Sequence, residues 1–294
     1  MIPVLLFATA FSLPARLPAE PAPTRVTILY DAFGGAPGLT RDWGFAALIE
    51  YQGKRILFDT GNNAEIFARN VDRLHVDLSR LDLVVISHRH SDHTAGLSVV
   101  LERNPHVSIY APREGFGIFG SGVPGTFYRA TPSLPDSMRY FAGVVPERIA
   151  AGTLWPAANI ILVDSTVTIA PGIRLVSLVS QTPGTLELRE LSLVLTTPEG
   201  GILVVGCSHP GIERIVAAAT TPGTPLRILF GGLHLVASPD SIIGALVERL
   251  HRTWHIAQMA PGHCTGEPAF AALKEEYGSD YLYAGLGKTI ALEP

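Results

Sequence analysis

The stretch LVVISHRHSDH, residues 83–93, decides the fold and gathers four potential metal ligands on one turn. Its apolar start, residues 83–86, predicts a buried strand, because such a run with β-branched members suits a sheet that is covered on both faces. The potential ligands that follow are His88, His90, Asp92 and His93. Positions 88 and 90 point to one side of an extended backbone, whereas the adjacent 92 and 93 point elsewhere. One turn is therefore expected to offer two ligands to one ion and two to a second.

A solvated loop is the alternative interpretation of this turn, and it is the usual one for a single His. Three His and one Asp within six positions, directly after a buried strand, favour a metal site instead. Imidazole suits zinc, copper, iron and nickel, and a carboxylate oxygen can complete or bridge such a site.

Composition limits the class of protein. The chain has 294 residues, of which 47% are hydrophobic, so it can bury a sizeable core as a single domain. Only 16% are charged, the formal net charge is −4, and no basic stretch indicates a nucleic-acid partner. A small-molecule substrate is expected.

The two cysteines, Cys207 and Cys264, are too few for a disulfide framework, and each lies near a His. We expect them in the site or as buried thiols at strand ends.

The N-terminus has the features of a leader. Residues 2–13, IPVLLFATAFSL, are apolar but too few to span a bilayer, and a Pro- and Ala-rich stretch follows. This pattern is typical of a secretory signal with a cleavage edge at Ala15 or Ala19, although the usual positive charge near the start is missing. We predict a signal peptide or disordered leader over 1–24, a periplasmic or secreted location, and no stable membrane insertion. A cytoplasmic location is the alternative.

Alternating strands and helices predict an α/β domain over residues 25–294. Strands are expected at 26–31, 83–87, 107–112, 160–163, 173–179, 191–197, 202–205 and 227–235, with a hairpin over 43–61 that turns at Gln52-Gly53. Helices are expected at 63–74, 94–104, 211–219, 240–253 and 268–277, with Asn62 or Asn63 capping the first and Ser238 or Asp240 capping the fourth. A short strand near 281–284 closes the chain. Residues 113–159 lack periodicity and are rich in Gly, Pro and aromatics, which predicts a loop-rich insertion over the mouth of the site, or a structural cap.

Three later strand ends also carry candidate donors. GGILVVGCSHPG (200–211) offers Cys207 and His209, RILFGGLHL (227–235) offers His234, and HIAQMAPGHCTG (255–266) offers His263. Strand ends on one edge of a sandwich converge, so these side chains are expected to meet the turn at 88–93. Asp59, at the end of LFDTG (57–61), is expected either to orient a ligand His or to close a turn.

The pattern H-x-H-x-D-H after an apolar strand resembles the metallo-β-lactamase superfamily. The elements G-C-S-H-x-G, G-G-x-H-L and H-C-T-G resemble more narrowly its branch of 7,8-dihydropterin-6-methyl-4-(β-D-ribofuranosyl)aminobenzene-5′-phosphate synthase-like proteins. The resemblance implies an αββα sandwich of two mixed sheets flanked by helices. It also implies a site for one or two divalent metal ions, here two zinc ions, with iron or manganese as alternatives.

The resemblance also implies a ligand set. His88, His90 and His209 are assigned to the first ion, and Asp92, His93 and His263 to the second. Cys207 occupies the strand end at which the superfamily commonly carries a bridging Asp. The family often has a further His in a P-G-H-like turn, but none follows Thr182-Pro183-Gly184. His209 therefore replaces it, or the first site is weaker.

The function implied is a metal-dependent hydrolase that directs a metal-activated hydroxide at a phosphoester or carbonyl substrate. Asp92 is expected to accept a proton as well as bind metal, and His234 to contact the developing anion, unless it is a structural His at a strand end. A second interpretation is a non-hydrolytic metal- or ligand-binding protein or a di-iron redox protein of the same fold. A β-lactamase is a third, which the G-C-S-H element and the insertion disfavour.

Overall fold

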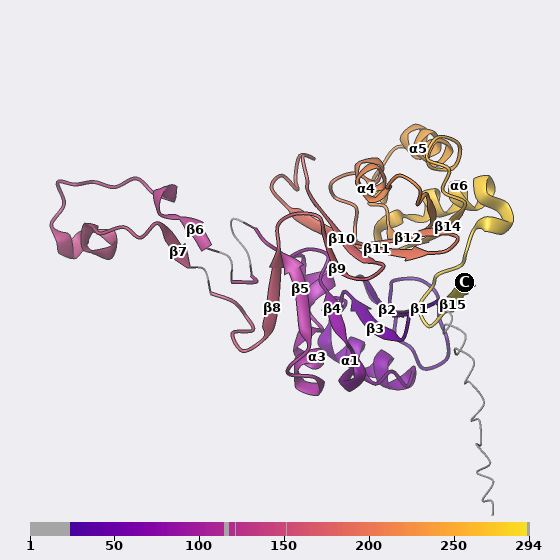
Figure 1. Cartoon of the computed structure of the whole chain (residues 1–294), viewed down its shortest axis with the longest axis horizontal. Coiled ribbons are helices and arrows are strands. Elements are labelled where there is room, and N and C mark those ends of the chain that lie inside the picture. Colours follow the sequence, from indigo (N-terminus) through magenta and orange to yellow (C-terminus); the bar gives the residue numbers. More distant parts are fainter. Residues whose placement is uncertain (1–23, 115–117, 121, 151, 293–294) are drawn as a thin grey trace, which may run out of the picture.

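The computed structural model describes residues 24–114, 118–120, 122–150 and 152–292. Almost all of the expected leader, 1–24, lies outside them. Two β-sheets pack face to face, and helices cover the outer face of each (Figure 1). The predicted αββα sandwich is confirmed.

The first sheet contains the strand that begins the sequence 83–93. Its strand order is β15-β1-β2-β3-β4-β5-β8. The bounds are β1 Thr24–Tyr30, β2 Ala46–Tyr51, β3 Lys54–Phe58, β4 Leu83–Val85, β5 Ser108–Pro112, β8 Asn159–Val163 and β15 Thr289–Leu292. Helices α1 Ala64–Arg73, α2 Ser91–Thr94 and α3 Leu97–Arg103 accompany it, with the short 3₁₀ turn η1 Leu78–Arg80. Strands β3, β4, β5 and β8 run parallel, so their carboxyl ends share one edge.

The second sheet has the order β14-β13-β12-β11-β10-β9. The bounds are β9 Val167–Ala170, β10 Ile173–Val179, β11 Arg189–Thr197, β12 Gly200–Val205, β13 Leu226–Gly232 and β14 Gln258–Gly262. Its helices are α4 Ile212–Ala219, α5 Asp240–Arg252 and α6 Glu267–Tyr277, with 3₁₀ turns η5 His263–Thr265 and η6 Gly278–Asp280. Strands β12, β13 and β14 are parallel, so the turns after them also share an edge.

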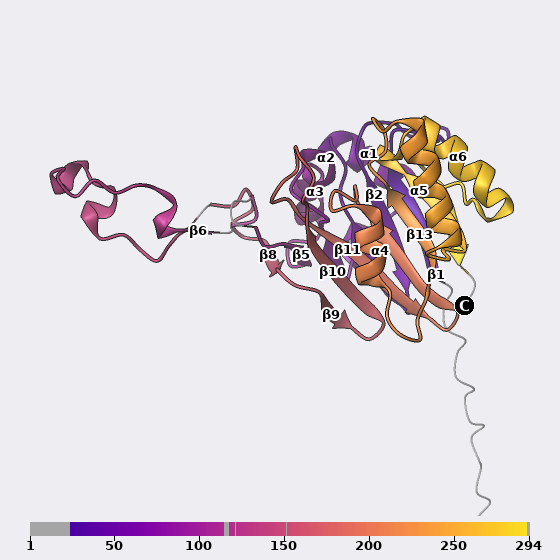
Figure 2. The same cartoon turned by 90° about the horizontal axis from the view of Figure 1, so that it is seen from above.

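The main core lies between the sheets. Alternate residues of β11, Leu191, Leu193 and Leu195, are fully buried there against Phe58 and Phe230. Each such side chain contributes about 1.5–3 kcal/mol when removed from water. The opposite face of the second sheet is covered by α4, α5 and α6, so both sheets are anchored on two sides (Figure 2). This rigid frame holds the strand-end turns in place.

The insertion differs from its prediction. Residues 122–150 form an arm that extends away from the sandwich in both views and contains β6 Gly122–Pro124, β7 Arg148–Ala150 and the turns η2 Gly125–Phe127, η3 Asp136–Met138 and η4 Tyr140–Gly143 (Figures 1 and 2). Its base is fixed by Phe119, whose ring stacks on Trp155 at 6.2 Å between centroids. The expected cover over the mouth of the site is therefore not seen. Apolar arm side chains such as Met138 and Val144 are exposed, because the arm projects away from the sandwich.

Two local predictions were wrong. The last strand is β15, not 281–284, where Tyr281 makes only an isolated bridge to Met259, because residues 289–292 pair with the free edge of β1 instead. Helix α5 has Pro239 at its N-cap and no side-chain cap, because the helix begins one residue later than a Ser238 cap requires. The predicted Asn63 cap of α1 is confirmed, with its side chain accepting from two backbone N–H groups. Among the described helices none is long and apolar enough to cross a membrane.

Candidate metal centre

Asp59 fixes the turn that follows β4. Its two carboxylate oxygens accept hydrogen bonds from the backbone N–H and the hydroxyl of Ser87, both at 2.7 Å. The Ser87 hydroxyl in turn lies 2.9 Å from Nδ1 of His88. This contact leaves Nε2 of His88 as the nitrogen that can bind an ion. Of the two roles left open for Asp59, the orienting one agrees with this geometry.

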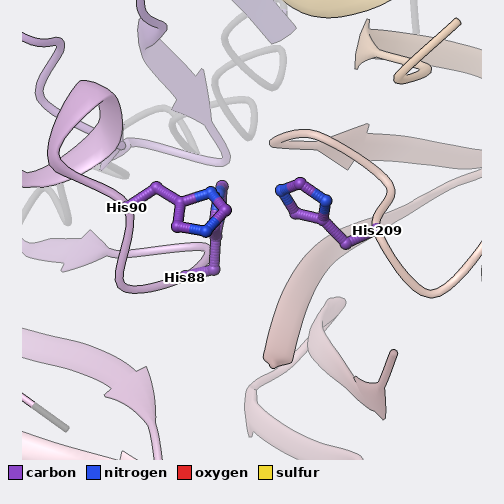
Figure 3. Close-up of side chains that lie close together, drawn as sticks. All are labelled: His88, His90 and His209. Carbon is purple, nitrogen blue, oxygen red and sulfur yellow. The ribbon is translucent and has the colours of Figure 1, made fainter. Parts of the chain in front are cut away.

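The first ligand set is His88, His90 and His209, whose ligand atoms all lie within 4.8 Å of one another. Figure 3 shows the His209 ring approaching from the turn after β12, opposite the other two. His88 Nε2 is 3.0 Å from His90 Nδ1. Two nitrogens on a tetrahedral zinc ion, each at about 2.1 Å from it, lie about 3.4 Å apart, so this spacing suits a shared ion.

His209 provides a separate test of fit. Both of its ring nitrogens are buried and have no hydrogen-bond partner among the residues that the structure describes. Buried polar groups are normally paired, and an unpaired one indicates a missing ion or water. An ion held with His88 and His90 would satisfy one of these nitrogens. This geometry agrees with the expectation that His209 takes the place of the His missing after Gly184.

The second ligand set is Asp92, His93 and His263. His263 Nε2 lies 3.2 Å from His93 Nε2 and 3.3 Å from Asp92 Oδ2. Nδ1 of His93 is occupied by Asp59 Oδ2 at 2.7 Å, which leaves Nε2 free for an ion. The two sets adjoin, because the ring centroids of His88 and His93 are 4.2 Å apart.

The electrostatics of the rings favour neutral ligands in the first set. Burial, followed by the neighbouring imidazoles, lowers the pKa of His88 well below its usual value and that of His209 to about 3. Burial also acts to lower the pKa of His93, but the charge and hydrogen bond of Asp59 outweigh it and raise that pKa to about 9. Without an ion, His93 therefore holds its proton to a higher pH than an ordinary His does.

Two buried carboxylates that the sequence analysis missed hold the other ligand turns. Glu190 on β11 accepts three backbone N–H groups, from Cys207 at 2.9 Å and from Ser208 and His209 at 2.8 Å each. Asp31, just after β1, accepts the N–H of His263 at 2.9 Å. Burial raises the pKa of each carboxyl to about 7. Asp31 directly follows β1, as Asp59 directly follows β3, so the same signal could have found it. Glu190 lies within β11, where no such signal marks it.

Beside the histidines lies a sulfur cluster, Cys207, Cys264 and His234, whose ligand atoms are also within 4.8 Å of one another. Both thiols are buried, whereas His234 is exposed. Burial raises the pKa of the Cys207 thiol, and it acts in the same direction on Cys264, where hydrogen bonds with Cys207 and His234 nevertheless lower the pKa well below its usual value. Cys207 Sγ is 3.2 Å from His93 Nε2, so this thiol adjoins the second ligand set as well.

A pocket of about 360 Å³ opens next to His209 of the first ligand set and His234 of the sulfur cluster. His209 and His234 form part of its wall, together with apolar side chains of α5 such as Ile242 and Leu246. Arg214 and Arg249 line it too, the latter paired with Glu213 at 2.8 Å. A small molecule with an apolar part fits such a lining.

The comparisons with known proteins agree with this fold. The family model described as the metallo-beta-lactamase superfamily matches residues 39–249. The chain belongs to the metallo-β-lactamase superfamily.

Within that class, two relatives from Methanocaldococcus jannaschii are similar along most of the chain. One, named 7,8-dihydropterin-6-methyl-4-(beta-D-ribofuranosyl)-aminobenzene-5′-phosphate synthase, is 26% identical over 84% of this chain and 89% of its own. An uncharacterised protein is 27% identical over 85% and 93%. The narrower resemblance predicted from the second-half motifs is therefore confirmed.

Solved structures show the same fold. Tm1679, described as a metal-dependent hydrolase of the beta-lactamase superfamily, has a TM-score of 0.67 at 24% identity and covers 92% of this chain and 100% of its own. A diphosphatase of the PhnP family has a TM-score of 0.54 at 14% identity, with 92% and 98% covered. At these identities the likeness concerns the fold alone.

The structure brings every predicted site residue to one edge of the sandwich. These are His88, His90, Asp92, His93, Cys207, His209, His234 and His263. His251 on α5 pairs instead with Glu276 on α6. The roles of the gathered residues remain predictions.

Proposed function

We propose that the protein is a metal-dependent hydrolase that acts on a phosphoester or carbonyl bond of a small molecule. The observation that carries the proposal is the pair of adjoining ligand sets, His88/His90/His209 and Asp92/His93/His263, beside a pocket. Divalent ions bound there, zinc or else iron or manganese, would lower the pKa of water and polarise the oxygen that gains charge.

In this proposal, residues of the protein bind the ions, orient the ligand rings and contact the substrate. Burial acts to raise the pKa of Asp92, but His263 and His93 hold it below its usual range, so Asp92 stays ionised and can serve as a ligand. Asp92 is also the candidate proton acceptor. Asp59 orients His93, and Trp43, at 5.1 Å between ring centroids, packs against His263. His234, on the pocket wall, is the candidate contact for the anion that develops on the substrate.

The experiment is a metal analysis of the purified protein together with a substrate panel of phosphodiesters, cyclic nucleotides, lactones and β-lactams, nitrocefin included. Turnover of one class that disappears on chelation, returns with zinc and is lost in His90→Ala supports the proposal. Turnover that survives both chelation and His90→Ala contradicts it.

Non-hydrolytic chemistry at an iron pair is the second candidate. It is raised by Cys207, whose sulfur lies 3.2 Å from Nε2 of His93 where the superfamily commonly has a carboxylate, so the donor set differs from the common one. The name of the M. jannaschii relative, a synthase, agrees with it. Iron in the purified protein with no hydrolysis across the panel would support this candidate over the first, and zinc with turnover would exclude it.

A further inference from the structure

The sulfur cluster occupies the carboxyl ends of three adjacent parallel strands. Cys207 follows β12, His234 follows β13 and Cys264 follows β14. Because parallel neighbours end at the same edge, three residues from separate parts of the chain meet there without any contribution from a long loop. Cys207 and Cys264 are only 3% and 2% exposed, so their sulfur atoms face the interior of the site.

Gly232, at the end of β13, leaves room for the Cys264 thiol. A Cβ atom on Gly232 would lie 2.7 Å from Cys264 Sγ and 2.5 Å from the carbonyl oxygen of Gly206. Both distances are too short for a real contact, so no other residue fits there without displacing the sulfur. The end of the central strand therefore lacks a side chain next to the Cys264 sulfur.

The backbone also adopts a costly conformation to present the third donor. His234 has φ of 53°, in the left-handed region that costs a non-glycine residue about 1–2 kcal/mol. Such strain persists where surrounding structure requires a particular side-chain direction, often at ligand sites. The ring stays near both thiols and also lines the pocket of about 360 Å³.

The donor set itself is specific. Two thiolates and one imidazole form a known zinc-binding set that keeps a fourth position open for water or substrate. Thiolates also select zinc, iron and other soft ions over magnesium or calcium. Hydrogen bonding explains this cluster less well, since the contact of Cys264 Sγ with the carbonyl oxygen of Cys207 is long, at 3.7 Å.

We propose that Cys207, Cys264 and His234 bind a third divalent cation, a thiophilic one such as zinc, beside the two histidine ligand sets. Cys207 is shared, because its sulfur also lies within 4.8 Å of the donor atoms of His88 and His93. His234 coordinates through one ring nitrogen, which leaves the other free to face the pocket. This inference does not depend on which reaction the protein catalyses.

The test is a Co²⁺ titration of the reduced, metal-free full chain, followed by absorption spectroscopy and native mass spectrometry. We expect three Co²⁺ ions at saturation and a thiolate-to-Co²⁺ charge-transfer band. Cys264→Ser and His234→Ala are each expected to bind two ions. Loss of a direct ligand should weaken the third ion more than the roughly 10–100-fold cost of losing an orienting partner.

Controls separate this proposal from the proposed function. His251→Ala removes an exposed His that pairs with Glu276, and it should leave three ions bound. If Cys264→Ser fails to fold, His234→Ala still provides the test, because its side chain is exposed. Two ions in the wild type, or an undiminished charge-transfer band in Cys264→Ser, would overturn the third site while leaving a two-ion hydrolase intact.

Discussion

Asp59 Oδ2 lies 2.7 Å from Nδ1 of His93, and both side chains are fully buried. The same carboxylate holds Ser87, so one acidic residue sets both the path of the ligand turn and the direction of a ligand ring. Glu190 and Asp31 repeat this arrangement at the two other ligand turns. Each ligand turn of the centre thus has its own buried carboxylate.

Replacing Asp59 should weaken metal binding without removing a ligand. In Asp59→Asn, the amide can no longer fix the tautomer of His93, and an orienting partner of this kind is worth about 10–100-fold in metal affinity. Competition with a chromophoric chelator measures the change. Asp82→Asn is the matched control, since Asp82 accepts a hydrogen bond from the exposed backbone N–H of Arg55. If Asp59→Asn binds metal as tightly as Asp82→Asn does, the orienting role of Asp59 is contradicted.

The same pair predicts a pH effect on the metal-free protein. Asp59 raises the pKa of His93 to about 9, above the value of about 6.5 expected in the unfolded chain, even though burial acts to lower it. A group whose pKa is higher in the folded than in the unfolded protein stabilises the fold fully at pH values below its unfolded pKa. That contribution is lost as the pH rises through its folded pKa. The stability advantage of the wild type over Asp59→Asn should therefore shrink from about pH 6.5 to about pH 9.

Urea unfolding in the presence of chelator, at several pH values, measures this difference. Comparing the two proteins isolates the pair, because the other ionisable groups of the site are common to both. An advantage that stays constant or grows over this range would be inconsistent with an ionised Asp59–His93 pair.

Much of this centre is predictable from sequence because its donors follow strands. His88, His90 and His93 are close in the chain, and His209 and His263 each follow an apolar strand, so convergence at one edge follows from topology. Glu190 was missed because it lies inside the strand β11, where a charged residue gives no indication of which backbone groups it will meet.

Glu190→Gln should destabilise the fold and reduce occupancy of the ion that His209 binds. A glutamine side chain has one oxygen in place of two, whereas Glu190 accepts three N–H groups through both of its oxygens. A buried donor left unpaired costs about 1–3 kcal/mol in the free energy of unfolding. Urea unfolding and metal counting check both effects. Glu248→Gln, which breaks only an exposed pair with Arg252, should change stability by less than about 0.5 kcal/mol.

The direction of the arm could not be predicted from sequence, because the sequence does not show which part of the sandwich the arm contacts. Its aromatics suggested a cover over the site, yet Tyr140 is 70% exposed and Tyr128 contacts it within the arm itself. Aromatic content indicates that a segment buries surface somewhere, but it does not specify against which element.

Shortening the arm should therefore leave the centre intact. Replacing residues 126–146 by a short Gly-Ser turn keeps the strand pair β6–β7 and the Phe119–Trp155 stack at its base. We expect unchanged metal stoichiometry and a change in the free energy of unfolding of less than about 1 kcal/mol, because few core contacts are removed. Removal of the exposed apolar group that includes Met138 and Val144 should also reduce aggregation. Loss of bound metal in this variant would show that the arm supports the centre.

The pocket beside His209 is expected to bind the apolar part of the substrate. Ile242 is 55% exposed on the pocket wall, so Ile242→Glu can alter the lining without opening the core. If the apolar part of the substrate packs there, KM should rise by roughly tenfold or more with kcat little changed, since one apolar contact is worth about 1–3 kcal/mol. Val167→Glu on β9 is the control, because Val167 is 39% exposed and lies on the far edge strand of the second sheet. Steady-state kinetics with the substrate class that the protein hydrolyses measure this change in KM. Equal KM values for Ile242→Glu and Val167→Glu would place the substrate outside this pocket.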